Sequence, residues 1–115
     1  GATTVENNDE QEILSATEAL LAEIIEKNEL APEDIAHIFI TVTHDLDAAF
    51  PAKAIRNLKG WELVPLMHAL EVPVRGALPR CIRLMVTVNT TKTQDEMVHV
   101  YLNGARVLRP DLVNR

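Results

Sequence analysis

The sequence predicts an α/β fold, in which a single domain over residues 1–115 contains a mixed β-sheet and flanking helices. Segments with helical spacing alternate along the chain with short segments rich in β-branched residues, and no repeat interrupts them. The chain has 115 residues, of which 47% are hydrophobic and 24% are charged. This size and this balance are typical of one domain with a substantial core.

The first third of the chain is expected to contain a strand end, a long helix and a turn. Residues 1–5 are small or β-branched and fit the end of a strand. Over residues 10–28, apolar side chains recur every three or four positions with acidic ones opposite them, which predicts an amphipathic helix. One of the polar residues at 7–9 can cap this helix, and residues 32–34 can open one short turn.

The middle third alternates between strand and helix. Residues 37–43 are β-branched or aromatic without strict alternation, which predicts a strand covered on both faces. Residues 50–58 are expected to form a second helix, with Pro51 in its first turn and Gly60 just past its end. A third strand is expected over residues 62–67.

A loop and a strong strand follow. Residues 71–79 hold two prolines and a glycine, which predicts a loop. Residues 81–88 form the clearest strand of the sequence. The period of two in a strand places Arg83 on the same face as Cys81 and opposite the face that carries Ile82.

The end of the chain allows two interpretations. Residues 93–96 match a capping box, and the apolar stripe after them predicts a helix up to residue 102. A final strand over residues 105–108 is expected next. The alternative is an Asn-Gly β-hairpin that joins two strands at residues 103–104.

Composition excludes several classes of protein. The longest apolar stretches are far shorter than the ~20 residues that cross a bilayer, so we expect no membrane partner. The sequence shows no basic and apolar leader, and its lone Cys81 cannot form an internal disulfide, which favours a reducing, cytoplasmic location. A net charge of -6 argues against nucleic acid as a partner.

Charge is unevenly distributed along the chain. Residues 1–38 carry ten acidic side chains against Lys27 alone, whereas ten of the eleven Lys and Arg residues follow residue 50. The acidic run is best explained as the solvated face of the first helix. An anionic ligand should therefore be held by the second half of the chain, and the scarcity of aromatic residues favours a small anion over a polymer.

Several kinds of site have no signature in the sequence. It contains no glycine-rich phosphate loop, no Gly-x-Ser-x-Gly motif and no Cys-x-x-Cys motif, which argues against nucleotide binding and hydrolysis. None of the four histidines is paired at metal-ligand spacing, and His68 and Glu71 form a single pair in an expected loop, so we expect no metal. Cys81 is expected to be a buried hydrophobe rather than a nucleophile.

The remaining polar chemistry is cationic. Arg83 projects from the middle of a strand between apolar neighbours, so an internal carboxylate or a ligand must satisfy it. Glu71 and Tyr101 are available as hydrogen-bonding partners, although a loop cap and a core residue are their default roles. Such a set suits a small ligand that bears carboxylates.

Three other cations could serve the same ligand. Lys53 and Arg56 are three residues apart and share one face of the second helix, and Arg109 lies near the end of the chain. For all three, ordinary surface charge is an equally good explanation.

Six segments of the sequence resemble the AroH-type monofunctional chorismate mutases. They read GATTVE, FPAKAIR, GW, CIR, HVYL and VLRPDL, and they occur in the family's order over almost the whole chain. The resemblance implies a homotrimer with a pseudo-α/β-barrel core and active sites in the clefts between subunits. The implied enzyme is an isomerase without a cofactor, which rearranges chorismate to prephenate on the route to phenylalanine and tyrosine.

The resemblance also implies roles for particular residues. Arg83 matches the arginine that faces the substrate's ether oxygen, Glu71 the carboxylate that accepts from its ring hydroxyl, and Tyr101 a tyrosine that helps to hold a carboxylate. The other implied contacts are Met67, His68, Ala69 and Leu70 in the pocket segment, Phe50, Ala52, Lys53 and Arg56 in the wall from the neighbouring subunit, and Leu108 and Arg109 in the mobile C-terminal cover.

The sequence departs from the family pattern at two places. The family has a substrate-binding arginine directly before the glycine that is Gly1 here. We expect a polypeptide that begins at Gly1 to bind chorismate about 10–100-fold more weakly than one that includes this arginine. His68 stands where a familiar member has a cysteine, and it could donate a hydrogen bond or simply pack.

The implied chemistry agrees with the residues present. An intramolecular rearrangement needs contacts that hold a flexible dianion in a compact chair, and positive charge beside the oxygen of the breaking bond. Two alternatives are a small trimeric ligand-binding or regulatory protein and an imine deaminase of similar fold, because each would also use an arginine for a carboxylate. Neither accounts for residues 50–56 and 99–112 occurring together.

Overall fold

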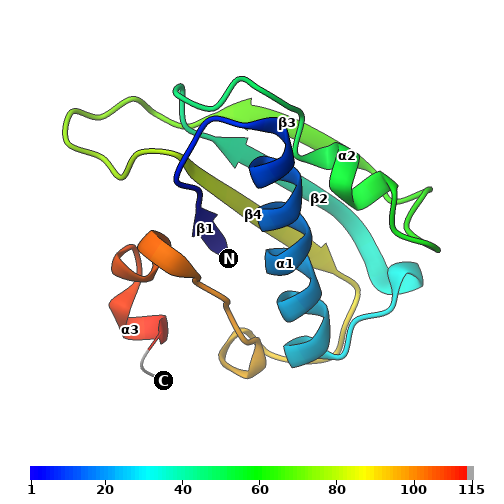
Figure 1. The fold of residues 1–115 in the computed structure, drawn as a ribbon. Helices are drawn as coiled ribbons and strands as arrows, with labels where there is room; N and C mark the ends of the chain where they lie inside the picture. Colours follow the sequence, from blue (N-terminus) through cyan, green and yellow to red (C-terminus); the bar gives the residue numbers. More distant parts are fainter. Residues whose placement is uncertain (114–115) are drawn as a thin grey trace.

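Four strands form one mixed β-sheet in the computed structural model, which describes residues 1–113 (Figure 1). In spatial order they are β1 (Ala2–Thr4), β4 (Cys81–Val88), β2 (Ile35–Val42) and β3 (Leu66–Leu70). β4 is antiparallel to β1 and β2, whereas β3 is parallel to β2. A helix lies in the connection between the parallel strands, so the predicted α/β class is confirmed.

Helix α1 (Glu10–Asn28) has the bounds that its periodicity predicts. The Asp9 carboxylate caps it by accepting a hydrogen bond from the backbone N–H of Glu12 at 3.0 Å. At the other end Glu29 adopts the left-handed conformation, with φ 52°, and terminates the helix. The expected short turn follows as a 3₁₀ helix, Pro32–Asp34.

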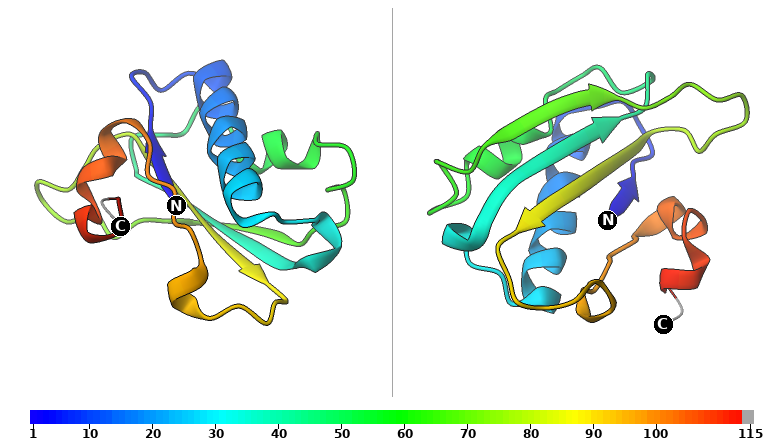
Figure 2. Two further views of the ribbon diagram at one scale, coloured as in Figure 1. Left: turned by 90° about the horizontal axis from the view of Figure 1, so that it is seen from below. Right: turned by 180° about the vertical axis from the view of Figure 1, so that it is seen from behind.

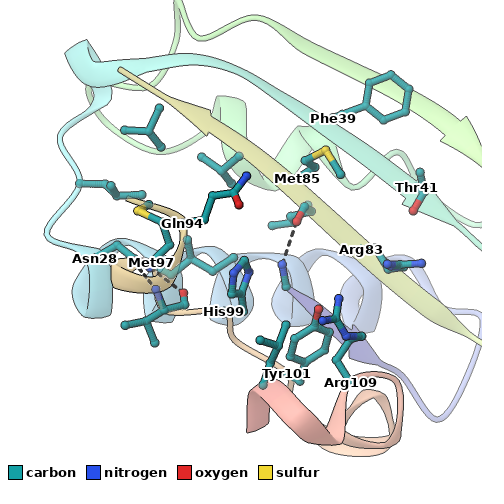
Figure 3. Close-up of a pocket in the computed structure, with 18 of the residues that line it drawn as sticks. Asn28, Phe39, Thr41, Arg83, Met85, Gln94, Met97, His99, Tyr101 and Arg109 are labelled. Atoms are coloured by element: carbon teal, nitrogen blue, oxygen red, sulfur yellow. Dashed lines mark hydrogen bonds between the residues drawn. The ribbon is translucent and has the colours of Figure 1, made fainter. Parts of the chain in front are cut away.

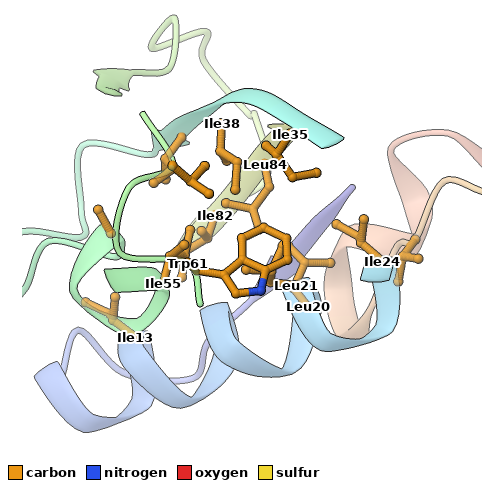
Figure 4. Close-up of a cluster of buried hydrophobic side chains, with 14 of the residues drawn as sticks. Ile13, Leu20, Leu21, Ile24, Ile35, Ile38, Ile55, Trp61, Ile82 and Leu84 are labelled. Carbon is orange, nitrogen blue, oxygen red and sulfur yellow. The ribbon is translucent and has the colours of Figure 1, made fainter. Parts of the chain in front are cut away.

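The main hydrophobic core lies between α1 and one face of the sheet (Figure 4). Leu20 and Leu21 of α1 are fully buried, as are Ile40 of β2 and Ile82 of β4, and Trp61 joins them from the loop before β3. Burying an aliphatic side chain of this size contributes about 1.5–3 kcal/mol relative to leaving it exposed. We call this the helix face of the sheet.

Helix α2 (Ala52–Arg56) packs on the helix face beside α1, as the left view of Figure 2 shows. It is shorter than the predicted 50–58, because Pro51 takes the capping position and a turn begins at Asn57. Ile55 anchors it in the core. No helix within residues 1–113 has the length and hydrophobicity to span a bilayer.

The opposite face of the sheet, which we call the open face, is left largely uncovered by the described chain. It carries Phe39 and Thr41 of β2, Met67 of β3, and Arg83 and Met85 of β4. Met67 is 63% exposed and Met85 is 70% exposed. The prediction that strand 37–43 is covered on both faces is therefore wrong for a single chain, since α1 and α2 both pack on the other face.

The third strand lies four residues later than predicted. Residues 61–64 form turns, from which Trp61 and Val64 still reach the core. Pairing begins at Pro65, which lacks an N–H but offers its carbonyl oxygen to the Ile38 N–H at 2.9 Å. The predicted strand 62–67 is therefore wrong for most of its length, and His68 lies in a strand rather than a loop.

The predicted helix up to residue 102 is wrong. The capping box at Thr93 and Glu96 exists, but it starts only a 3₁₀ turn, Gln94–Glu96. The chain then runs extended, because partners from elsewhere satisfy its backbone. The Asn28 side-chain oxygen accepts from the Val98 N–H at 2.7 Å, and Ala2 forms a bridge with Tyr101.

The predicted final strand and the alternative hairpin are both wrong as well. Residues 105–108 fall mostly within a 3₁₀ helix, Asn103–Val107, in which Asn103 has a φ of 53°. A one-turn helix α3 (Pro110–Val113) follows. These elements curl over one end of the open face, where Cys81 is buried against Ala105.

Candidate active site

A charged cluster lies on the open face, where β2, β3 and β4 meet. Thr41 of β2 pairs in register with Arg83 of β4, and Glu71 continues the line of β3 by donating its N–H to the Val42 carbonyl oxygen at 2.9 Å. One Glu71 carboxylate oxygen, Oε1, lies 3.5 Å from Nη1 of Arg83. The other, Oε2, accepts a hydrogen bond from the Thr41 hydroxyl. Both oxygens of this carboxylate are thus fixed by neighbouring strands.

Arg83 is held in place without being enclosed. Of the two expected partners, an internal carboxylate or a ligand, the structure shows the carboxylate of Glu71. The Arg83 side chain is 47% exposed, so the expectation of a costly buried charge is wrong. An ion pair this open contributes at most about 1 kcal/mol to stability. Its main effect is geometric, because it orients a guanidinium that keeps further donors free to meet an anion.

A cavity of about 990 Å³ extends from this cluster along β4 (Figure 3). Its lining includes Arg83 and Glu71 on the sheet side, and Tyr101 and Arg109 on the opposite C-terminal segment. We call it the β4 cavity. The structure thus gathers four of the predicted site residues around one space, large enough for a small organic ligand.

Arg109 and Tyr101 reach the β4 cavity by different means. Tyr101 is positioned by its backbone bridge to Ala2, at the edge of the sheet. The Arg109 guanidinium is paired with Asp111, with Nε to Oδ1 at 3.1 Å and Nη2 to Oδ2 at 2.8 Å. This hydrogen bonding from Arg109 lowers the pKa of the Asp111 carboxyl below its usual value.

A second cavity, of about 710 Å³, lies between α2 and β3. We call it the α2 cavity. The predicted site residues that line it are Phe50, Lys53, Arg56, His68, Ala69 and Leu70. The Lys53 ammonium lies 3.7 Å from a Glu10 carboxylate oxygen, and both side chains are more than half exposed. The predicted residues are therefore divided between two cavities within one chain.

Three predicted contacts line neither cavity. Met67 projects from the open face, Ala52 is buried beneath the start of α2, and Leu108 packs against the small cluster that contains Cys81. Ala52 still touches the α2 cavity indirectly, since its backbone N–H donates to Nε2 of His68 at 3.2 Å.

The structure also shows what Cys81 can do. The side chain is buried, and burial raises the pKa of the Cys81 thiol to about 11, so it is a thiol at neutral pH. This confirms the expectation of a buried hydrophobe. Within residues 1–113, no three His, Cys, Asp or Glu side chains gather into a possible metal site.

Sequence reasoning missed three partners of the predicted charges. Thr41 binds Glu71, Glu10 pairs with Lys53, and Asp111 pairs with Arg109. Only Asp111 had a usable signal, because it lies two residues after its arginine. Thr41 and Glu10 come close to their partners only through strand pairing and helix packing, which the sequence alone does not specify.

Comparison with known proteins gives consistent results. The family model described as chorismate mutase type I matches residues 1–112. The chain is 52% identical to the chorismate mutase AroH of Bacillus subtilis, over 97% of this chain and 88% of that protein. It is 48% identical to the chorismate mutase AroH of Thermus thermophilus, over 97% of this chain and 92% of that protein. The solved structure of a chorismate mutase from Clostridium thermocellum is similar to this one, with a TM-score of 0.89 and 53% sequence identity. The match covers 93% of this chain and 95% of that chain.

Proposed function

The chain belongs to the chorismate mutase type I family, and from this premise we propose how its residues hold the substrate and assemble the active site. It is an isomerase that rearranges chorismate to prephenate, a step of aromatic amino acid biosynthesis. The alternatives of a ligand-binding protein and an imine deaminase are not favoured, because the match extends over residues 1–112.

Arg83 is the residue that stabilises the transition state. As the ether C–O bond breaks, negative charge grows on the oxygen, and a fixed guanidinium beside it lowers the barrier. The observation that carries this role is the pairing of Arg83 with Glu71 at 3.5 Å on the rim of the β4 cavity. Glu71, whose carboxylate is oriented by Thr41, accepts a hydrogen bond from the ring hydroxyl of the substrate.

The two substrate carboxylates need further positive charge. Arg109 and Tyr101 contact one of them from the C-terminal wall of the β4 cavity. Lys53 and Arg56, which belong to the α2 cavity of the same chain, contact the substrate bound to a neighbouring chain. The division of the predicted residues between two cavities supports this arrangement, because the substrate needs both sets of charges.

The assembly that brings the two cavities together is a homotrimer. Met67 and Met85 are exposed apolar side chains beside the partly buried Phe39 on the open face, and a neighbouring chain would cover them. Each active site lies in the cleft between two chains and combines one β4 cavity with the neighbour's α2 cavity. The whole chain, 1–115, acts as one domain, and the unpaired Cys81 is compatible with the cytoplasm.

Mixing two inactive variants tests the shared site directly. One variant carries Arg83→Met and the other carries Lys53→Ala with Arg56→Ala, and each alone should lose most of its chorismate mutase activity. When the two are unfolded together and refolded as mixed trimers, about a quarter of the sites combine an intact Arg83 with an intact Lys53 and Arg56. Activity should therefore return to about that fraction of the parent's. The loss of chorismate absorbance measures it.

Two results would contradict the proposal. If mixed samples stay as inactive as the separate variants while light scattering shows that trimers form, the site lies within one chain. If light scattering gives a monomer mass at micromolar concentration, no neighbour is available to complete the site. Refolding the parent alone in the same way gives the reference activity.

A further inference from the structure

The start of α2 makes a contact with β3 that is separate from the packing of the helix in the core. The first N–H of this five-residue helix, on Ala52, donates to Nε2 of His68 at 3.2 Å. The next two N–H groups, on Lys53 and Ala54, are satisfied locally by carbonyl oxygens at 3.0 Å. The Phe50 ring also lies against the imidazole, with ring centroids 5.4 Å apart and planes tilted by 48°.

His68 is well placed to act as an anchor, because it belongs to the sheet. It pairs in register with Ile40, which is fully buried in the core. Its imidazole points to the helix face and is partly buried below the start of α2. The contact therefore links a rigid strand to a helix that is too short to be stable by itself.

We propose that His68 is a positioning residue that fixes the start of α2, and with it Lys53 and Arg56, in the orientation that binds the substrate, and that it does so in its neutral form. This inference rests on the proposed role of the two cations. His68 itself transfers no proton in the reaction.

The neutral form is required by the direction of the hydrogen bond. Nε2 accepts from Ala52, so the ring proton of neutral His68 is on Nδ1. If Nε2 were also protonated, it would be a donor facing the N–H donor of Ala52, and the hydrogen bond would be lost. The charged groups around the same cavity are Lys53 and Arg56 on α2, Glu10 on α1 and Asp47 in the loop before α2.

The surroundings keep the imidazole neutral at physiological pH. Burial, and then the positive charge of Arg56, lower the pKa of His68 below its usual 6.5. Because the folded value is the lower one, the contact is present above pH 6.5 and is lost as the pH falls through the folded value. A loosened α2 should weaken substrate binding more than it slows the chemical step, since Arg83 lies on a different element.

Steady-state kinetics of two variants test this inference across pH 5 to 8. His68→Gln keeps a side-chain oxygen that can accept from Ala52 and does not titrate, whereas His68→Leu keeps the bulk and removes the acceptor. A lost hydrogen bond of ordinary strength predicts that His68→Leu raises KM about 3- to 10-fold at pH 7.5, with kcat changed less. His68→Gln should stay near the parental KM at this pH.

The pH profile distinguishes positioning from simple packing. The KM of the parent should rise as the pH falls below 6.5. Protonation of His68 causes part of this rise, and neither variant should show that part. His37→Gln, a histidine outside both cavities, should keep the parental profile. The inference is overturned if His68→Leu matches the parental KM, or if His68→Gln keeps the full acidic rise.

Its failure can be distinguished from failure of the proposed site. If the Lys53→Ala and Arg56→Ala double variant leaves KM unchanged, these cations do not bind substrate and the proposed site is wrong. If that variant raises KM while the His68 variants do not, the site is correct and only the positioning role is lost.

Discussion

The two faces of the same four strands differ sharply. On the helix face Ile40 and Ile82 are fully buried among closely packed apolar side chains. On the open face Met85 lies exposed beside Arg83, and the polar groups are ordered by charge and hydrogen bonds. The alternation of residues along β4 thus separates two tasks. One set of side chains stabilises the fold, and the other carries the proposed active site and the proposed contact between chains.

Removing the charge of Arg83 should give the largest effect, which is a loss of kcat. If it also unfolded the chain, the two faces of β4 would not have separate roles. Arg83→Met should lower kcat by at least about 10²–10³-fold, because a preorganised donor and its full charge are lost together. The free energy of unfolding should change by no more than about 1 kcal/mol, since the ion pair is half exposed. Kinetics and urea unfolding measure the two quantities.

Arg75→Met is the matched control, because this arginine lies exposed in the loop before β4 and lines neither cavity. It should leave both quantities unchanged. A kcat of Arg83→Met within a few-fold of the parent's would show that Arg83 is a structural residue.

Two neighbours on β4 sharpen the comparison. Leu84 lies on the helix face and is 3% exposed, so Leu84→Ala should lower the free energy of unfolding by about 2–5 kcal/mol at any protein concentration. Met85→Ala, on the open face, should lower the free energy of unfolding less. In the proposed trimer this loss should depend on protein concentration, because the substitution would weaken contacts between chains. Urea unfolding at two protein concentrations separates them. Equal, concentration-independent losses would mean that no neighbour covers the open face.

The smallest expected effect is on stability at high pH and comes from Cys81. This residue is on the open face of β4 but is buried against Ala105. Its pKa of about 11 lies above the usual 9.0, so the unfolded chain loses this proton first as the pH rises. The free energy of unfolding should fall between pH 9 and 11 by up to about 1.4 kcal/mol for each pH unit on account of this group. Cys81→Ala should show a shallower decline over the same range. Parallel curves would mean that the thiol is open to solvent.

Elements with a strong internal pattern were predictable from the sequence. The periodicity of α1 and the alternation of β4 gave their bounds directly, because both patterns are local. The stretch after residue 96 was not predictable, since Val98 finds its partner on Asn28 and Tyr101 on Ala2. A helical stripe of apolar residues could not reveal that these distant groups would satisfy an extended backbone.

The candidate site shows the same limit. The sequence indicated that Arg83 needs an anion, but it could not say which carboxylate lies beside it. The displaced start of β3 decides this, because pairing from Pro65 onward brings Glu71 to the open face beside Arg83. The predicted strand over 62–67 ends before Glu71 and places it in a loop, so the prediction does not say which face of the sheet Glu71 lies on.

The pairing of the two ends of the chain has a consequence for its synthesis. A ribosome makes β1 before α1 and β4, yet two partners of its side chains lie far later in the sequence. Asn103 donates to the Thr3 hydroxyl and the Gly104 N–H donates to the Thr4 hydroxyl, each across 100 residues. Until those residues emerge, the hydroxyls of Thr3 and Thr4 lack these two partners, although the backbone of β1 can already pair with β4. A nascent chain that has reached residue 97 already contains α1 and β4, but it has no Tyr101 to face Arg83. The wall of the β4 cavity that carries Tyr101 and Arg109 is thus completed by residues that are translated after both α1 and β4.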